Sequence, residues 1–106
     1  MSFKFMRIIL FFDLPSKTKL EVREYTKFVK HLKQNGFMMF QESVYTKLCI
    51  NQNVANSAMK DIKKVVPPRG FISCLIITET QFSSIENILG DLKTDVINSE
   101  DKIIKL

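Results

Sequence analysis

Asp13 is the residue of this sequence best placed to hold a metal ion. It follows the apolar run Ile8–Phe12 and is the only acidic side chain between Met1 and Leu20. A continuous apolar run of this length is typical of a strand buried on both faces, so we expect the strand to hold Asp13 firmly at the rim of a sheet. Because a fixed carboxylate is a hard oxygen ligand, Asp13 is a candidate ligand for magnesium.

A basic helix is expected shortly after Asp13, over Lys17–Lys33. Its cations would extend along roughly 25 Å at about 1.5 Å per residue and would attract phosphate groups. The candidate nucleic-acid-binding residues are Lys17, Lys19, Arg23, Lys27, Lys30 and Lys33. Nothing in this segment resembles a helix that reads base edges, so contacts to the nucleic-acid backbone are expected. The alternative is a basic face that is merely solvated, and it applies equally to the further candidates Arg7 and Arg69.

No general base accompanies Asp13 in the sequence. His31, the only histidine, is expected on the basic helix as an ordinary surface residue, far from the strand end. A metal held by carboxylates alone would lack the positioned acid and base that efficient phosphodiester hydrolases use. A structural role for Asp13 therefore stays open, since an aspartate before Leu14-Pro15 can accept backbone hydrogen bonds in a turn or cap the next helix.

Composition indicates one domain over residues 1–106. The 106 residues, 45% of them hydrophobic, are enough to bury a core without disulfides. The net charge of +5 is uneven: the first two thirds are basic and suit a polyanion, whereas the acidic last third is expected to face a protein or solvent. Cys49 and Cys74 lack zinc-site spacing and are expected as buried free thiols in a reducing cytoplasm. No apolar run is long enough to span a membrane, so we expect a cytoplasmic protein without membrane contact.

Apolar periodicity and turn residues predict four strands, three helices and a short terminal strand. Thr18 and Thr78 each precede a helix, with Glu21 and Gln81 three residues later in the spacing of a capping box, and Gly90 is expected to end the last helix. The expected strands are Phe5–Phe12, Phe37–Phe40, Ser43–Ile50, Phe71–Ile77 and Lys102–Leu106. The second helix is expected to begin at Asn51 or Asn53 and to end before Pro67-Pro68.

This order of elements predicts an α+β, ferredoxin-like βαββαβ core over residues 1–77, with a C-terminal helix and strand over residues 78–106. Right-handed crossovers would place the first and third strands in the centre of the sheet and both long helices on one face. The other face would expose Phe and Met side chains, which normally indicates a partner. We therefore expect a homodimer with its sheets packed face to face, in which the terminal strand pairs with an edge of the second subunit.

Two segments, Arg7–Pro15 with its strand-terminal aspartate and Gly36–Cys49, resemble the second CRISPR-associated (Cas) protein family in its type II form. The similarity covers nearly the whole chain. It implies a homodimer that acts in CRISPR adaptation (spacer acquisition), where it bridges subunits of the CRISPR integrase and helps to hold a short double-stranded DNA, the prespacer. It also implies a magnesium-dependent endonuclease activity on single-stranded RNA or double-stranded DNA, with Asp13 as the catalytic and metal-binding residue. In the family, the two copies of this aspartate face each other across the dimer axis and can share a magnesium ion.

The competing interpretation is a non-catalytic RNA- or DNA-binding ferredoxin-like module, because RNA-recognition modules have the same order of strands and helices. Such modules stack bases on aromatic residues within a Lys/Arg-Gly-aromatic signature. The strand Ser43–Ile50 offers Tyr45 but not that signature, so Tyr45 is expected in packing or in the dimer interface. On the sequence alone, whether the protein is an enzyme stays open.

Overall fold

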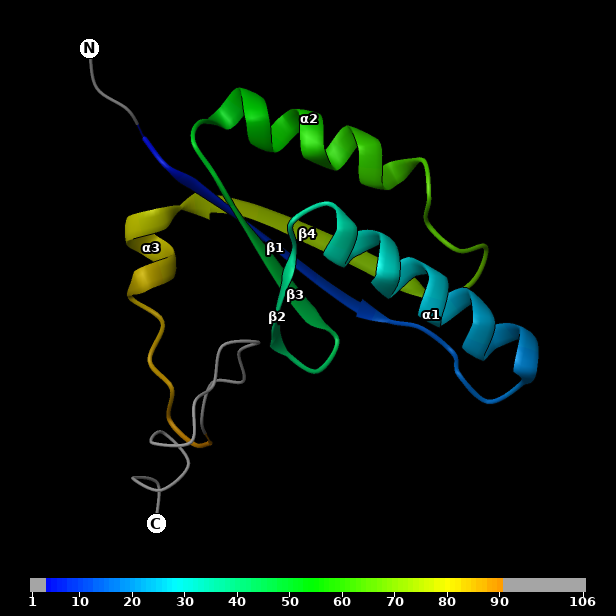
Figure 1. The fold of residues 1–106 in the computed structure, drawn as a ribbon. Helices are drawn as coiled ribbons and strands as arrows, with labels where there is room; N and C mark the ends of the chain where they lie inside the picture. Colours follow the sequence, from blue (N-terminus) through cyan, green and yellow to red (C-terminus); the bar gives the residue numbers. More distant parts are fainter. Residues whose placement is uncertain (1–3, 91–106) are drawn as a thin grey trace.

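The computed structural model describes residues 4–90, which form a four-stranded antiparallel sheet with two long helices and one short helix (Figure 1). The strands are β1 (Met6–Asp13), β2 (Met38–Gln41), β3 (Val44–Cys49) and β4 (Phe71–Thr78). The helices are α1 (Lys19–Gln34), α2 (Gln52–Lys63) and α3 (Glu79–Ser83). The sheet order β2-β3-β1-β4 places β1 and β3 in the centre, which confirms the predicted ferredoxin-like core. No helix in this range is long and apolar enough to cross a membrane.

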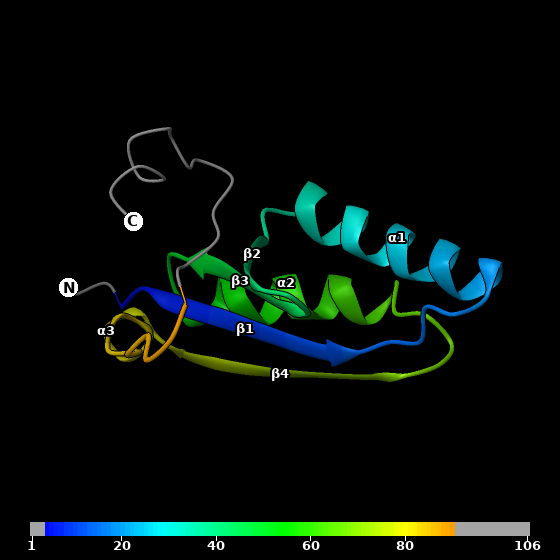
Figure 2. The same ribbon diagram turned by 90° about the horizontal axis from the view of Figure 1, so that it is seen from below.

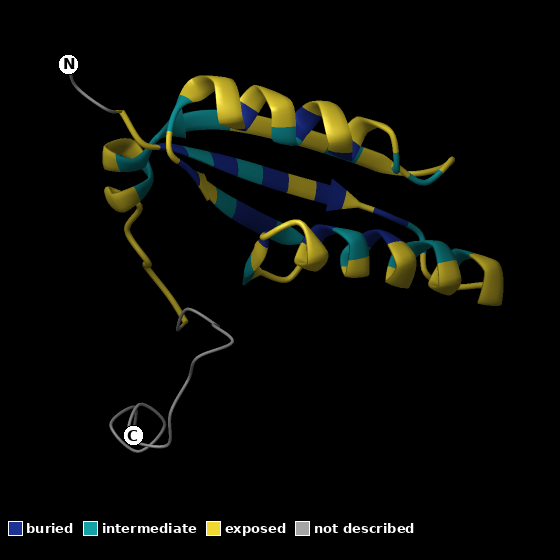
Figure 3. Cartoon of the chain, turned by 45° about the horizontal axis from the view of Figure 1, so that its top comes forward, coloured by how far each residue is buried: buried dark blue, intermediate teal, exposed yellow. Residues whose placement is uncertain are grey.

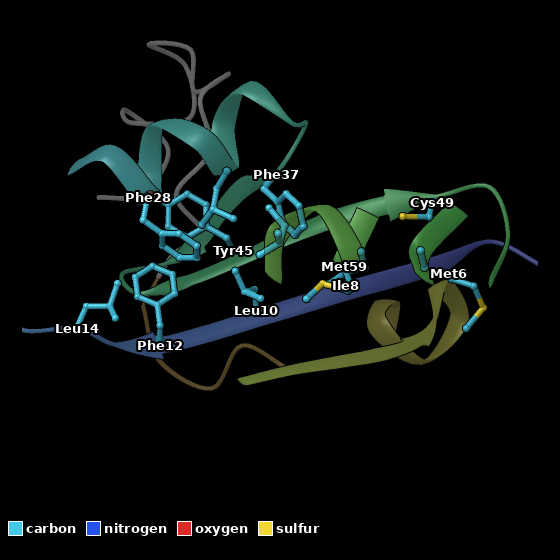
Figure 4. Packing of buried hydrophobic residues seen from close by; sticks show 13 residues of the cluster. Met6, Ile8, Leu10, Phe12, Leu14, Phe28, Phe37, Tyr45, Cys49 and Met59 are labelled. Carbon is cyan, nitrogen blue, oxygen red and sulfur yellow. The ribbon is translucent and has the colours of Figure 1, made fainter. Parts of the chain in front are cut away.

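The core lies between one face of the sheet and the helices α1 and α2. Along β1, Met6, Ile8, Leu10 and Phe12 are buried, and the residues between them are more exposed (Figure 3). Phe12 packs under α1, with its ring centroid 5.6 Å from that of Phe28 (Figure 4). The prediction that β1 is buried on both faces is therefore wrong, because the helices cover one face and leave the other open.

Helix α1 begins at the predicted capping box. The Thr18 hydroxyl accepts a hydrogen bond from Glu21 N at 3.1 Å, and the Glu21 carboxylate accepts one from Thr18 N at 3.0 Å. Phe28 and Leu32 form the buried side of the helix, at the spacing expected from the sequence. The residues that precede and begin α1 are thus fixed by local hydrogen bonds, which sets how the chain leaves the end of β1.

Helix α2 begins after Asn51, whose side chain accepts a hydrogen bond from Val54 N at 2.8 Å. Asn51, and not Asn53, is therefore the N-cap residue. The buried residues of α2 are Ala55, Met59 and Ile62. Because these residues pack in the same core as α1, both helices belong to one layer above the sheet.

Helix α3 begins at the second predicted capping box, in which Thr78 is the N-cap. It ends at Ser83 and not at Gly90, so the prediction of a longer helix is wrong. Ile85 and Leu89 are exposed beyond its end, where burial is too slight to sustain further turns. The helix lies beside the start of β1 and the end of β4 (Figure 2). The predicted terminal strand lies outside the described residues.

The two cysteines are free, as predicted, but only Cys49 is buried. Burial raises the pKa of the Cys49 thiol above its ordinary value. Cys74 is exposed although it lies opposite Leu10, on the helix side of the sheet, because β4 is an edge strand of the sheet. The prediction of a buried thiol is therefore wrong for Cys74.

The face of the sheet opposite the helices is open and largely apolar, as predicted. Its exposed hydrophobic side chains are Phe11, Met38, Leu48, Phe71 and Leu75. One end of this face is occupied by an ion pair, in which Arg7 donates to both carboxylate oxygens of Glu79 and lies 4.2 Å from the centroid of the Phe82 ring. The face-to-face homodimer stays a prediction.

Candidate metal and nucleic-acid site at the end of strand β1

Asp13 is the last residue of β1 and lies opposite Phe71, the first residue of β4. Alternation along β1 places it on the open face of the sheet, where it is exposed. Its carboxylate makes no hydrogen bond or ion pair with any residue in the range 4–90. The alternative role of capping α1 is wrong, because Thr18 is the N-cap. Within the described residues, the carboxylate is thus unengaged.

Close packing against Gly70 holds the backbone around Asp13. Gly70 has a φ of +101°, and a Cβ atom there would lie 2.8 Å from the backbone oxygen of Asp13 and 2.7 Å from Cδ2 of Leu14. Leu14 is itself buried in the core. Because a side chain at position 70 would displace these atoms, the end of β1 has little freedom to move.

The donor set at Asp13 can supply part of a magnesium shell. Residues 4–90 contain no cluster of three or more His, Cys, Asp or Glu side chains that could hold a metal ion. Magnesium, however, commonly binds only one or two carboxylates and fills its octahedral shell with water. A rigid, exposed carboxylate with two unengaged oxygens fits that chemistry. Asp13 is the residue that would hold the ion.

All six predicted nucleic-acid-binding residues are exposed. Five of them lie on α1 and one just before it: Lys19, Arg23, Lys27, Lys30 and Lys33, preceded by Lys17. The helix spans 16 residues, which corresponds to about 24 Å. The structure therefore gathers these cations along one element that begins shortly after Asp13 in the chain. Whether they contact nucleic acid stays a prediction.

His31 does not reach Asp13. It is half-buried in the last turns of α1, whereas Asp13 precedes the first turn of that helix. The further candidates Arg7 and Arg69 are engaged by carboxylates, Arg7 with Glu79 at 2.8 Å and Arg69 with Glu24 at 3.7 Å. These contacts favour a structural role for Arg7, which is also covered by the Phe82 ring.

Two features of this region were not foreseen from the sequence. Lys64 lines the same surface hollow as Lys27, a cavity of about 340 Å³ between α1 and the segment after α2. Phe71 stands beside Asp13 on the open face. The hydrophobic pattern of β4 indicated a strand, but the partner of each residue depends on the register between β1 and β4, which local sequence does not reveal.

Fold and site together define a small ferredoxin-like domain with an exposed strand-end carboxylate, a basic first helix and an open apolar sheet face. Residues 6–85 match the profile of the family described as CRISPR associated protein Cas2. The chain therefore belongs to the Cas2 family.

Three relatives illustrate the similarity. The chain is 41% identical over 101 residues to a protein of Treponema denticola, with 95% of this chain and 100% of that protein covered. It is 40% identical over 101 residues to a protein of Ligilactobacillus salivarius, with the same coverage. It is 42% identical over 102 residues to a protein of Streptococcus mutans serotype c, with 95% and 93% covered. All three relatives are named CRISPR-associated endoribonuclease Cas2.

Proposed function

We propose that this protein acts in CRISPR adaptation as a homodimer that binds DNA and bridges integrase subunits, and that it is a magnesium-dependent endonuclease whose metal-binding residue is Asp13. Membership of the Cas2 family and the names of its relatives support the nuclease assignment. The observation that carries the proposal is the unengaged carboxylate of Asp13 at the rigid end of β1.

The open sheet face supports the homodimer. Its exposed hydrophobic side chains form a surface of the kind that soluble proteins normally cover with a partner. Packing two such faces together would bring the ends of both β1 strands into one assembly. The two Asp13 carboxylates would then repel each other at neutral pH unless a cation or a shared proton lay between them.

The role of Asp13 in this scheme is to hold the cation and to set its position relative to the phosphodiester. A magnesium ion at that position would polarise a phosphate oxygen or lower the pKa of a bound water. In residues 4–90, no group of three or more His, Cys, Asp or Glu side chains could hold a metal ion, and His31 lies in the last turns of α1. Slow cleavage is therefore expected, since positioned acids and bases usually contribute about 10²–10⁴-fold.

The exposed cations of α1 support nucleic-acid binding through phosphates. For a duplex, each neutralised phosphate contributes about 0.9 to the slope of log affinity against log salt concentration. If the six basic residues each neutralise one phosphate, the slope is about −5 per chain and about twice that for a dimer. Double-stranded DNA is the expected ligand, and RNA is the second substrate class that the family implies.

The decisive experiment compares the wild-type protein with Asp13→Asn and Asp13→Ala. Cleavage of single-stranded RNA and of duplex DNA is measured with and without magnesium, and spacer integration is measured with the cognate integrase. Glu86→Gln, which removes an exposed carboxylate in the segment after α3, is the matched control.

We expect both Asp13 variants to lose cleavage while they keep nucleic-acid affinity, and the Glu86 variant to behave as wild type. Unchanged cleavage by Asp13→Asn would refute the nuclease assignment. Integration that persists in both Asp13 variants would assign the adaptation role to a non-catalytic, DNA-holding scaffold. Loss of integration with normal affinity would place the Asp13 chemistry inside adaptation.

A further inference from the structure

The open face of the sheet has two unlike halves. At one end, α3 lies against β1 and β4, and the Arg7 side chain beneath it is only 18% exposed. Along β4, exposure rises from Ile77, half-buried opposite Arg7, to 53% at Leu75 and 78% at Phe71, which lies opposite Asp13. Within residues 4–90, the uncovered half of this face is therefore the half that ends in Asp13.

Two charges of opposite sign lie on this face. Among the strand residues of the range 4–90, Arg7 and Asp13 are the only charged ones that alternation and register place there. They lie at opposite ends of β1, about 20 Å apart. If two such faces packed with antiparallel strands and slid until Arg7 of each copy met Asp13 of the other, two ion pairs would form. That arrangement competes with the one in which the two Asp13 carboxylates meet.

Helix α3 compensates the charge of Arg7 within the same chain. Nε of Arg7 donates to Oε1 of Glu79 at 2.8 Å, and Nη2 donates to Oε2, so the pair is bidentate. The Phe82 ring lies 4.2 Å from the guanidinium carbon and packs 5.5 Å from the Phe40 ring on β2. The backbone N–H of Glu79 also donates to Phe5 O at 2.9 Å, which fixes the start of α3 beside the start of β1. Arg7 is thus paired and covered before a second chain arrives.

We propose that Glu79, by holding Arg7 beneath α3, keeps this cation away from Asp13 of a second copy and confines the dimer contact to the half of the face that ends in Asp13. The two Asp13 carboxylates then meet and hold one cation between them. This inference rests on the proposed homodimer and its metal site, and it adds the residues that set the offset of the two chains. Glu79 is a positioning residue in this scheme, and Asp13 is the residue that holds the metal.

The distance between two spin labels reports how the chains are offset. The label is attached at Ser57→Cys, an exposed position of α2 in the helix layer, away from the open face. The protein also carries Cys74→Ser, so that its remaining native thiol is the buried Cys49. Double electron–electron resonance, with magnesium present, then measures the distance between the two copies of position 57, and sedimentation measures the mass.

Three variants of the labelled protein carry the test. Glu79→Gln frees Arg7 with little change of shape, and Arg7→Gln/Glu79→Gln removes the freed cation as well. Glu24→Gln is the matched control, because Glu24 pairs with Arg69 at 3.7 Å from its place on α1, on the helix side of the sheet.

We expect Glu79→Gln to remain a dimer whose label distance shifts by up to about 20 Å, the length of the slide that brings Arg7 to Asp13. The double variant should return to the wild-type distance, since no cation is left to compete, and Glu24→Gln should keep that distance throughout. An unchanged distance in Glu79→Gln would overturn the proposal. So would a double variant that stays shifted, or a Glu79→Gln protein that sediments as a monomer, because the pair would then serve only to support α3 or association.

Binding of manganese, used in place of magnesium and followed by its own resonance signal in unlabelled protein, separates this proposal from the metal site. We expect a single manganese ion per dimer in wild type, its loss in Asp13→Asn and Glu79→Gln, and its return in the double variant. If wild type binds no manganese through Asp13 while Glu79→Gln still shifts the label distance, the proposed metal site is wrong and the role of Glu79 in the offset stands. Equal manganese binding by wild type and Glu79→Gln would remove Glu79 from the positioning of Asp13.

Discussion

Gly70 gives the sharpest test of how the fold fixes Asp13. Gly70→Ala would add a Cβ atom 2.8 Å from the backbone oxygen of Asp13 and 2.7 Å from Cδ2 of Leu14, at a φ of +101°. A non-glycine residue at positive φ costs about 1–2 kcal/mol, and forcing extra volume into a packed site costs about 1–3 kcal/mol. The free energy of unfolding should therefore fall by about 2–5 kcal/mol, a large share of the about 5–15 kcal/mol typical of a domain.

Gly90→Ala is the matched control for Gly70→Ala. Gly90 has a φ of +86°, but a Cβ atom there would meet nothing within 4 Å. In this variant the free energy of unfolding should fall only by the cost of a non-glycine residue at positive φ, about 1–2 kcal/mol. The assay is urea unfolding followed by circular dichroism at one protein concentration, since association would shift the apparent stability.

The comparison of the two glycine variants decides the argument. A cost for Gly70→Ala no larger than that for Gly90→Ala would refute the claim that tight packing holds the end of β1. If the claim is right, a folded Gly70→Ala protein should also cleave RNA more slowly, because any relaxation of the clash must move the backbone of Asp13 or Leu14. Gly90→Ala should leave cleavage unchanged.

Three further predictions concern other parts of the chain. A hydrogen bond from the backbone N–H of Thr18 lowers the pKa of Glu21 below its ordinary value of 4.5; this carboxylate therefore stabilises the fold above its unfolded pKa, and the stabilisation is lost as the pH falls through the folded pKa. Glu21→Gln should make the free energy of unfolding less dependent on pH in the acidic range, as measured by urea unfolding at a series of acidic pH values. An unchanged pH profile would contradict the capping contact. A disulfide reagent should modify the exposed thiol of Cys74 quickly and the buried thiol of Cys49 slowly, so Cys74→Ser should abolish the fast phase; a fast phase that persists would contradict the burial pattern. Lys27→Gln should reduce the salt slope of duplex binding by about 0.9 per chain, or about twice that for a dimer, and an unchanged slope would remove Lys27 from the interface.

Local signals in the sequence predicted the helix starts and the strand order well. The capping boxes at Thr18 and Thr78 are formed by residues three apart, so their geometry depends on almost nothing else. The central place of β1 followed from the order of elements and the handedness of crossovers. Asp13 could be singled out for the same reason, because a strand end and a lone carboxylate are both local features.

What depended on distant parts of the chain was harder to predict. The apolar run of β1 indicated burial on both faces, but one face is covered only if a second chain supplies a cover. The end of α3 at Ser83 was missed because Ile85 and Leu89 have the spacing of a helix without a surface to pack against. The neighbourhood of Asp13 and Phe71 is set by pairing between strands far apart in the chain, which no local pattern encodes.

The position of β1 in the middle of the sheet also determines when the site can exist during synthesis. β1 is made first, yet its two neighbours in the sheet are β3 and β4, and Asp13 meets Phe71 only after most of the domain has been made. At about 5–20 residues per second, roughly 3–12 s separate the synthesis of these two residues. The ribosome thus makes Asp13, the candidate metal ligand, long before the strand that completes its surroundings, and a chain truncated before β4 could not assemble the candidate site.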